Sequence, residues 1–111
     1  MGDESPGRVV PAEEVTFRRV VRALRARRRY RYVKPEVRRE GDGFVVLSPC
    51  CSRNVDASGG VIPIAWLQRA GPGWRLVRRD HAQGLWVSCR EGSLASVLEL
   101  LCDDPERVFW P

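Results

Sequence analysis

Residues 61–90 decide the fold, and they read VIPIAWLQRAGPGWRLVRRDHAQGLWVSCR. They contain three apolar stretches of strand length: Val61–Gln68, Trp74–Arg79 and Leu85–Arg90. The turn residues between them, Gly71–Gly73 and Asp80–Gly84, leave room only for short connections. Strands joined by such short turns are antiparallel, because a parallel pair needs a crossover of about a dozen residues or more. The stretch therefore predicts three consecutive strands of a meander.

The side-chain pattern within these stretches indicates where the sheet is regular. Pro63 lies inside the first stretch and has no N–H to donate, so it favours an edge strand or an irregularity. The third stretch alternates, with Leu85, Val87 and Cys89 on one face and Trp86, Ser88 and Arg90 on the other.

Two further strands are expected upstream. Phe44–Leu47 is an apolar run that follows the turn Gly41–Gly43. An earlier strand begins at Tyr30–Val33, and Pro35 limits it to an edge position or a bulge. Ser48–Gly60 is rich in turn-forming residues and is predicted to be the longest loop.

Amphipathic periodicity predicts a helix at each end of the chain. Pro11 suits the first position of the N-terminal helix, which ends near Arg28. Its apolar stripe consists of Phe17, Val20, Val21 and Leu24. Ser93 can cap the C-terminal helix, and Asp103–Pro105 stops it. The apolar face of that helix consists of Leu94, Val97, Leu98 and Leu101. Phe109–Trp110 is expected to fold back on the core, because an aromatic pair left in water would waste a large buried area.

We therefore predict an α+β fold, an antiparallel sheet of about five strands in a meander with the N-terminal and C-terminal helices packed on one face. The chain has 111 residues, of which 43% are hydrophobic and 30% charged, and this suits one globular domain. Residues 1–10 show no apolar periodicity and are expected to form a disordered tail. The single domain then spans residues 11–111.

The sequence favours a protein of the cytoplasm that does not enter a membrane. No stretch approaches the ~20 apolar residues of a membrane helix, and Met1–Arg8 lacks the apolar core of a secretory signal. In a reducing compartment, the four cysteines are expected to be free thiols without disulfide or metal. They are Cys50, Cys51, Cys89 and Cys102. Three of them, Cys50, Cys51 and Cys89, could form a zinc site with His81, although zinc ligands usually come in spaced pairs.

Positive charge is concentrated in one part of the chain. The formal net charge is +5, but between Arg18 and Arg39 eleven Lys and Arg residues face one acid, Glu36, a local balance of +10. Such asymmetry indicates an anionic partner or a neighbouring acidic surface. A coding bias toward arginine is an alternative cause, since Lys34 is the only lysine of the chain.

The arginine-rich segment is the candidate binding site. Its candidate residues are Arg22, Arg25, Arg28, Arg29, Arg31 and Tyr32. Guanidinium groups bind phosphate in a bidentate manner, and a tyrosine on a strand can stack on a base. Together they predict a surface for RNA or single-stranded DNA. The alternative is a solvated helix face whose arginine stems cover the edge of the core.

Other chemistry-bearing motifs favour structural explanations. Asn54–Gly59 imitates the start of a calcium loop, but the twelfth position is Ala65 instead of a bidentate Glu, so a plain turn is expected. His81 follows Asp80 in a turn, and a catalytic dyad would also need a nucleophile. We expect no enzyme activity and no cofactor. Four tryptophans, Trp66, Trp74, Trp86 and Trp110, could line a ligand groove, but at least two are expected in the core.

The pattern also resembles a known family. Trp74-Arg75-Leu76 leads to Arg79-Asp80, Trp86, a short helix and Phe109-Trp110, and Ile62–Ala65 lies upstream. This resembles a family of short uncharacterised bacterial proteins, domain of unknown function three-oh-two-four, from Val15 to Trp110. The resemblance implies a bacterial cytoplasmic setting. It transfers no activity and identifies no catalytic residue.

The sequence thus predicts a small basic binding module that contacts RNA or single-stranded DNA through its arginine-rich helix and strand. The alternative is a protein–protein interaction or regulatory domain that uses the exposed face of the sheet and has no nucleic-acid role.

Overall fold

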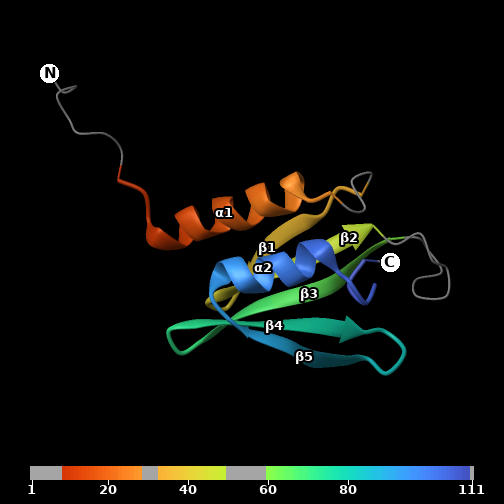
Figure 1. The fold of residues 1–111 in the computed structure, drawn as a ribbon. Coiled ribbons are helices and arrows are strands. Elements are labelled where there is room, and N and C mark those ends of the chain that lie inside the picture. The colour runs from red at the N-terminus through yellow and green to blue at the C-terminus, as the bar shows by residue number, and fades with distance from the viewer. Residues whose placement is uncertain (1–8, 29–32, 50–59, 111) are drawn as a thin grey trace, which may run out of the picture.

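The computed structural model describes residues 9–28, 33–49 and 60–110 (Figure 1). Its elements are α1 (Ala12–Ala26), β1 (Glu36–Glu40), β2 (Gly43–Pro49), β3 (Val61–Ala70), β4 (Gly73–Asp80), β5 (Leu85–Gly92) and α2 (Leu94–Asp103). The sheet has the order β1-β2-β3-β4-β5, and every neighbouring pair is antiparallel. The predicted α+β meander with a helix at each end is confirmed. The predicted disordered tail falls mostly on residues 1–8, outside the described residues.

The helix α1 forms as its sequence predicts, with small shifts at both ends. Pro11 occupies the N-cap position, and the acidic Glu13 and Glu14 lie in the first turn, where they favour the positive end of the helix dipole. Val20 and Leu24 are buried. The helix ends at Ala26, before the predicted end near Arg28, because Arg27 already has extended backbone angles.

The first strand was predicted at the wrong place. It was expected to begin at Tyr30–Val33, but β1 begins at Glu36, and Val33 lies in a coil segment. Tyr30 and Tyr32 lie outside the described residues. The strand begins directly after Pro35, whose nitrogen cannot donate to a ladder. β1 is an edge strand, which agrees with the constraint that Pro35 imposes.

The pairing register shifts at two places in the sheet. In the pairing of β2 with β3, Val46 lies opposite Ala65 and Leu47 opposite Pro63, so Ile64 is an extra residue. The irregularity predicted from Pro63 is therefore confirmed, but the edge position is wrong, because β3 lies between β2 and β4.

The second irregularity interrupts the predicted alternation of β5. Leu76 lies opposite Arg90 and Val77 opposite Ser88, which leaves Cys89 as the extra residue. Leu76 and Val77 are neighbours in one strand and face opposite sides of the sheet. Arg90 and Ser88 therefore lie on different faces, not on the same face as the alternation predicted. Arg90 Nη1 accordingly donates to the carbonyl oxygen of Ser96 in α2.

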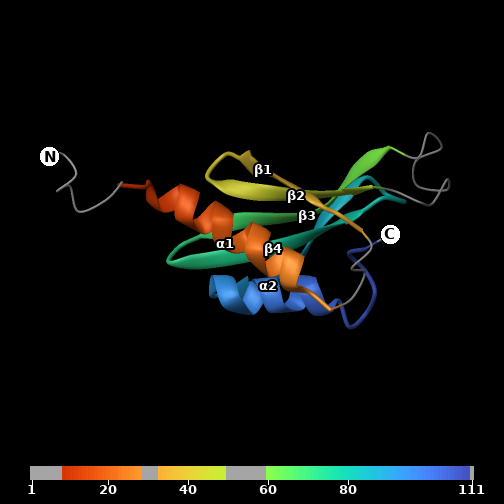
Figure 2. The same ribbon diagram turned by 90° about the horizontal axis from the view of Figure 1, so that it is seen from above.

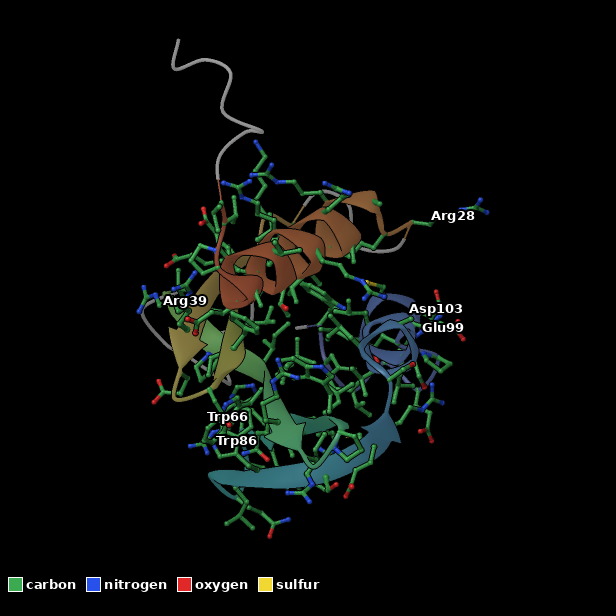
Figure 3. All side chains as sticks on the ribbon, turned by 90° about the vertical axis from the view of Figure 1, so that its left-hand side faces the viewer. Arg28, Arg39, Trp66, Trp86, Glu99 and Asp103 are labelled. Atoms are coloured by element: carbon green, nitrogen blue, oxygen red, sulfur yellow. The ribbon has the colours of Figure 1, made fainter. Side chains whose placement is uncertain are left out.

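Both helices pack on the concave face of the curved sheet (Figures 2 and 3). The core between these two layers includes Phe44, Leu67, Trp74, Leu76, Leu98, Leu101 and Trp110. Trp74 and Trp110 are each 5% exposed, so the expectation that at least two tryptophans belong to the core is confirmed. The rings of Trp66 and Trp86 contact each other edge to face at 5.6 Å between centroids. Both residues are half-buried and lie on the convex face.

The C-terminal segment closes the core as predicted. Ser93 caps α2 through its hydroxyl, which accepts from the Ser96 N–H at 3.1 Å. Phe109 and Trp110 fold back and are buried. The indole Nε1–H of Trp110 donates to the carbonyl oxygen of Leu101 at 2.9 Å, so the ring is fixed against the last turn of α2.

Candidate functional site

Arginines on α1, together with Arg28 just beyond its end, form an exposed cationic surface. Arg22, Arg25 and Arg28 are exposed, and no ion pair involving them is found among the described residues. Arg18 is different, because its Nη2 lies 2.8 Å from the carboxylate of Glu14 one turn earlier. Since Val20 and Leu24 bury the opposite side of α1, the arginines remain directed outward.

The structure brings together only part of the predicted site. Arg22 and Arg25 lie one turn apart on α1 and line the same hollow. Arg28 lies beyond the end of α1 and projects away from the molecule (Figure 3). The remaining predicted residues, Arg29, Arg31 and Tyr32, lie outside the described residues.

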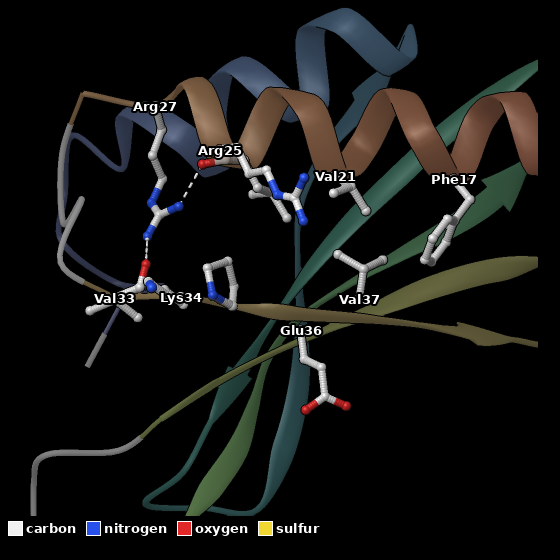
Figure 4. A pocket seen from close by; sticks show the side chains of 10 residues that line it. Phe17, Val21, Arg25, Arg27, Val33, Lys34, Glu36 and Val37 are labelled. Carbon is white, nitrogen blue, oxygen red and sulfur yellow. Dashed lines mark hydrogen bonds between the residues drawn. The ribbon is translucent and has the colours of Figure 1, made fainter.

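A groove of about 640 Å³ lies between α1 and the segment that leads into β1 (Figure 4). Its apolar walls include Phe17 and Val21 from α1 and Val37 from β1. Arg25 and Lys34 supply positive charge along it. A smaller hollow of about 330 Å³ shares Phe17, Val21 and Arg25 with this groove and is also lined by Arg18 and Arg22. We call the two together the α1–β1 groove.

Arg27 closes one end of the groove and is held within the protein. It is 6% exposed, and its guanidinium donates to the carbonyl oxygens of Leu24 and Val33 (Figure 4). The guanidinium carbon also lies 4.3 Å from the centroid of the Trp110 ring, as in a cation–π contact. Burial lowers the pKa of Arg27. Arg27 therefore joins α1 to the segment before β1 and to the C-terminus, and does not belong to the exposed cationic surface.

Asp104 carries a buried carboxylate whose structural role the sequence analysis did not predict. The sequence predicts only a helix stop at this position, yet Asp104 is fully buried. It accepts hydrogen bonds from the backbone N–H groups of Val108 at 2.7 Å, Phe109 at 3.2 Å and Trp110 at 3.2 Å. An acidic residue at a helix end directly before a proline was the available signal. Its described bonds hold the C-terminal segment in place.

Asp80 and His81, the two residues considered as a catalytic dyad, lie where β4 turns into β5. Asp80 accepts hydrogen bonds from the backbone N–H and the side-chain amide of Gln83, at 3.1 and 3.2 Å. These bonds stabilise the turn between β4 and β5, in which His81 lies. Burial lowers the pKa of His81, and the nearby positive charge of Arg79 lowers it further.

Two of the four cysteines can be described, and both are free thiols. The Cys102 thiol lies 3.6 Å from the carbonyl oxygen of Ala23, and burial raises its pKa to about 11. Burial also raises the pKa of Cys89. Cys50 and Cys51, like the segment Asn54–Gly59, lie outside the described residues. Among those that are described, no three His, Cys, Asp or Glu side chains gather as metal ligands would.

The fold defines a small two-layer α+β domain in which an antiparallel meander carries two helices on one face. A family model described as "Domain of unknown function (DUF3024)" matches residues 9–111, and the chain belongs to this family. The resemblance inferred from the tryptophan and Arg-Asp pattern is thereby confirmed. No curated protein and no solved structure matches the chain. None of the described helices is long and apolar enough to cross a membrane.

Proposed function

We propose that this chain is a non-enzymatic binding module of the bacterial cytoplasm that binds RNA or single-stranded DNA. The ligand lies along the exposed side of α1, where Arg22 and Arg25 contact its phosphates, and Arg28 extends the contact beyond the helix end. Arg29, Arg31 and Tyr32, which follow directly in the sequence, complete the proposed surface.

The observation that carries this proposal is that three exposed arginines, two on α1 and one just beyond its end, lack an ionic partner among the described residues. Arg22, Arg25 and Arg28 have no ion pair among the described residues, so their charge is available to a ligand. Two acids of the same region pair with other arginines, Glu14 with Arg18 and Glu36 with Arg38, each at 2.8 Å. An exposed guanidinium without an internal partner is well suited to bidentate phosphate binding.

Salt dependence tests the proposal directly. A fluorescently labelled single-stranded oligonucleotide is titrated with the full chain at increasing salt, and its anisotropy is measured. Affinity should fall with salt with a slope of about −0.7 for each phosphate contact. Replacing Arg22, Arg25 and Arg28 with alanine should flatten that slope by about 2 without unfolding the protein. Tyr32→Ala should weaken binding by about 1–3 kcal/mol if the ring stacks on a base.

A matched control variant distinguishes the effect of the α1 surface from the effect of the protein's net charge. The variant with Arg38, Arg75 and Arg90 replaced by alanine loses the same formal charge from exposed or half-buried positions outside α1. Arg38 and Arg75 are paired with Glu36 and Glu91, respectively. We expect its salt slope to stay close to that of the parent. The proposed function would be contradicted if both variants reduced the salt slope equally, or if the affinity did not change with salt concentration.

A second candidate function, a protein-interaction domain without a nucleic-acid role, is favoured by one observation. The half-buried Trp66 and Trp86 lie on the sheet face that the helices leave open (Figure 3), and Arg79 lies 5.2 Å above the Trp86 ring. Aromatic residues and arginine are enriched at protein interfaces. Failure of the oligonucleotide to bind at any salt concentration would favour this candidate.

A further inference from the structure

The outer edge of the sheet at β1 lies next to the α1–β1 groove. Among the described residues, β1 pairs only with β2, so the backbone groups on its other side have no strand partner. The sheet curls so that this edge turns toward α1 (Figure 3). The position of the next strand, if one were added, therefore falls beside the helix.

Neighbouring side chains of β1 point to opposite sides of the sheet, with apolar Val37 on the groove side and charged Glu36 on the convex side. Val37 faces α1 and lines the groove, whereas Glu36 points to the other side (Figure 4). On that side the Glu36 carboxylate is paired with Arg38 at 2.8 Å. With Phe17 and Val21 from α1, Val37 gives the groove apolar walls directly beside an open sheet edge.

We propose that the α1–β1 groove binds an extended acidic segment of a partner protein, which adds to β1 as a sixth strand. Its backbone pairs with the open edge of β1, as in other cases of strand addition. Successive residues of a strand point to opposite sides, so every second side chain enters the groove and can be apolar. The acidic side chains between them and at the ends of the segment reach the arginines at the groove mouth.

Charge complementarity decides the chemistry of the occupant. Arg22, Arg25 and Lys34 line the groove and are exposed. Among the described residues, the only acid that lines it is Glu36, whose side chain is turned away and paired with Arg38. An acidic segment is therefore attracted and a basic one repelled. This inference goes beyond the proposed function and rests on the open edge and the apolar walls. Because both ligands use Arg22 and Arg25, the acidic strand and nucleic acid compete.

The first test measures binding of a defined probe to the full chain. The probe is a fluorescein-labelled octapeptide that alternates valine and glutamate, and its anisotropy is followed at constant salt. Saturable binding is expected, and Arg22→Glu with Arg25→Glu should weaken it by about tenfold or more. The control variant with Arg75→Glu and Arg90→Glu has the same net charge and should bind within about twofold of the parent.

The second test asks whether the peptide backbone pairs with β1. In an antiparallel pair only every second residue directs its N–H toward the neighbouring strand. Two probes are therefore N-methylated at alternate residues, one in each phase. One phase should abolish binding, and the other should leave it close to that of the parent probe. A ligand held by charge alone would not distinguish the two phases.

Four results would overturn the proposal. Equal binding of both N-methylated probes, or of an octapeptide of glutamate alone, would show an electrostatic contact without strand addition. The edge would be assigned to a second copy of this chain if the probe did not bind and the protein formed dimers that depend on its concentration and are lost in Val37→Pro. The groove would be assigned to nucleic acid if the peptide did not bind and a single-stranded oligonucleotide bound more weakly to Val21→Ala and Val37→Ala than to the parent.

Discussion

At the scale of single residues, Asp104 shows how one buried carboxylate fixes a chain segment. Its φ of 40° places it in the left-handed region that follows a helix, where Asp and Asn are tolerated better than most residues. The three backbone N–H groups that it binds belong to consecutive residues 108–110. The carboxylate therefore sets the path of the backbone that brings Phe109 and Trp110 into the core.

Asp104→Ala should be among the most destabilising substitutions in the chain. It leaves buried N–H groups without an acceptor and should lower the free energy of unfolding by about 3 kcal/mol. Asp104→Asn keeps one acceptor oxygen and tolerates the same φ, so its loss should be about 1–2 kcal/mol. Urea unfolding followed by tryptophan fluorescence measures both. Equal stability of Asp104→Ala and the parent would show that the hydrogen bonds contribute nothing.

At the scale of elements, the β1–β2 hairpin offers a matched pair of glycines. A Cβ on Gly43 would collide with the carbonyl oxygen of Leu67 in β3, which is backbone and cannot move aside alone. A Cβ on Gly41 meets open space, and only its φ of +62° opposes a side chain. We expect Gly43→Ala to cost about 3 kcal/mol and Gly41→Ala about 1 kcal/mol. Thermal unfolding of the two variants tests this order, and a reversed order would contradict the close packing of β2 on β3.

The sequence predicted the elements that local chemistry determines. The turn Gly71–Gly73 and the helix cap Ser93 contain residues that favour those structures by themselves, and both were placed correctly. The start of β1 was missed because aromatic residues at 30–33 suit a strand, while Pro35 decides where the ladder can begin. The bulge at Cys89 follows from pairing with β4, and no local signal predicts it.

The candidate site could be predicted only in part, because charge counting ignores partners. The local balance of +10 includes Arg27, which is buried against Trp110, and Arg38, which is paired with Glu36. The burial of Arg27 depends on Trp110 at the other end of the chain, which local periodicity does not reveal. The Arg38 pair depends on Glu36 lying two residues earlier in the same strand, and the predicted strand start at Tyr30–Val33 did not place these two residues in β1. The α1–β1 groove was also missed, since it arises where Phe17 and Val37 approach in the fold.

At the scale of the whole molecule, the two faces of the sheet contribute differently to stability. Trp74 is buried on the helix side, with its ring stacked on Phe44 at 5.9 Å between centroids. Trp86 is half-buried on the open side. Trp74→Ala should therefore lower the free energy of unfolding by about 3–5 kcal/mol, and Trp86→Ala by about 1 kcal/mol. Chemical denaturation of both variants measures the difference, and equal losses would mean that the convex face is covered as well.

The Arg27–Trp110 contact has a consequence for the order of folding events. Every strand pair of the described sheet joins neighbours in the chain, so the hairpins can form early and with little loop-closure entropy. Arg27 and Trp110, by contrast, come from opposite ends of the chain, and their contact must wait until both helices have docked. Release of α1 from the core breaks this contact and the packing of Val20 and Leu24, but it breaks no ladder between the described strands. In amide hydrogen exchange, α1 should therefore open at a lower free energy than β3, as an opening unit separate from the sheet.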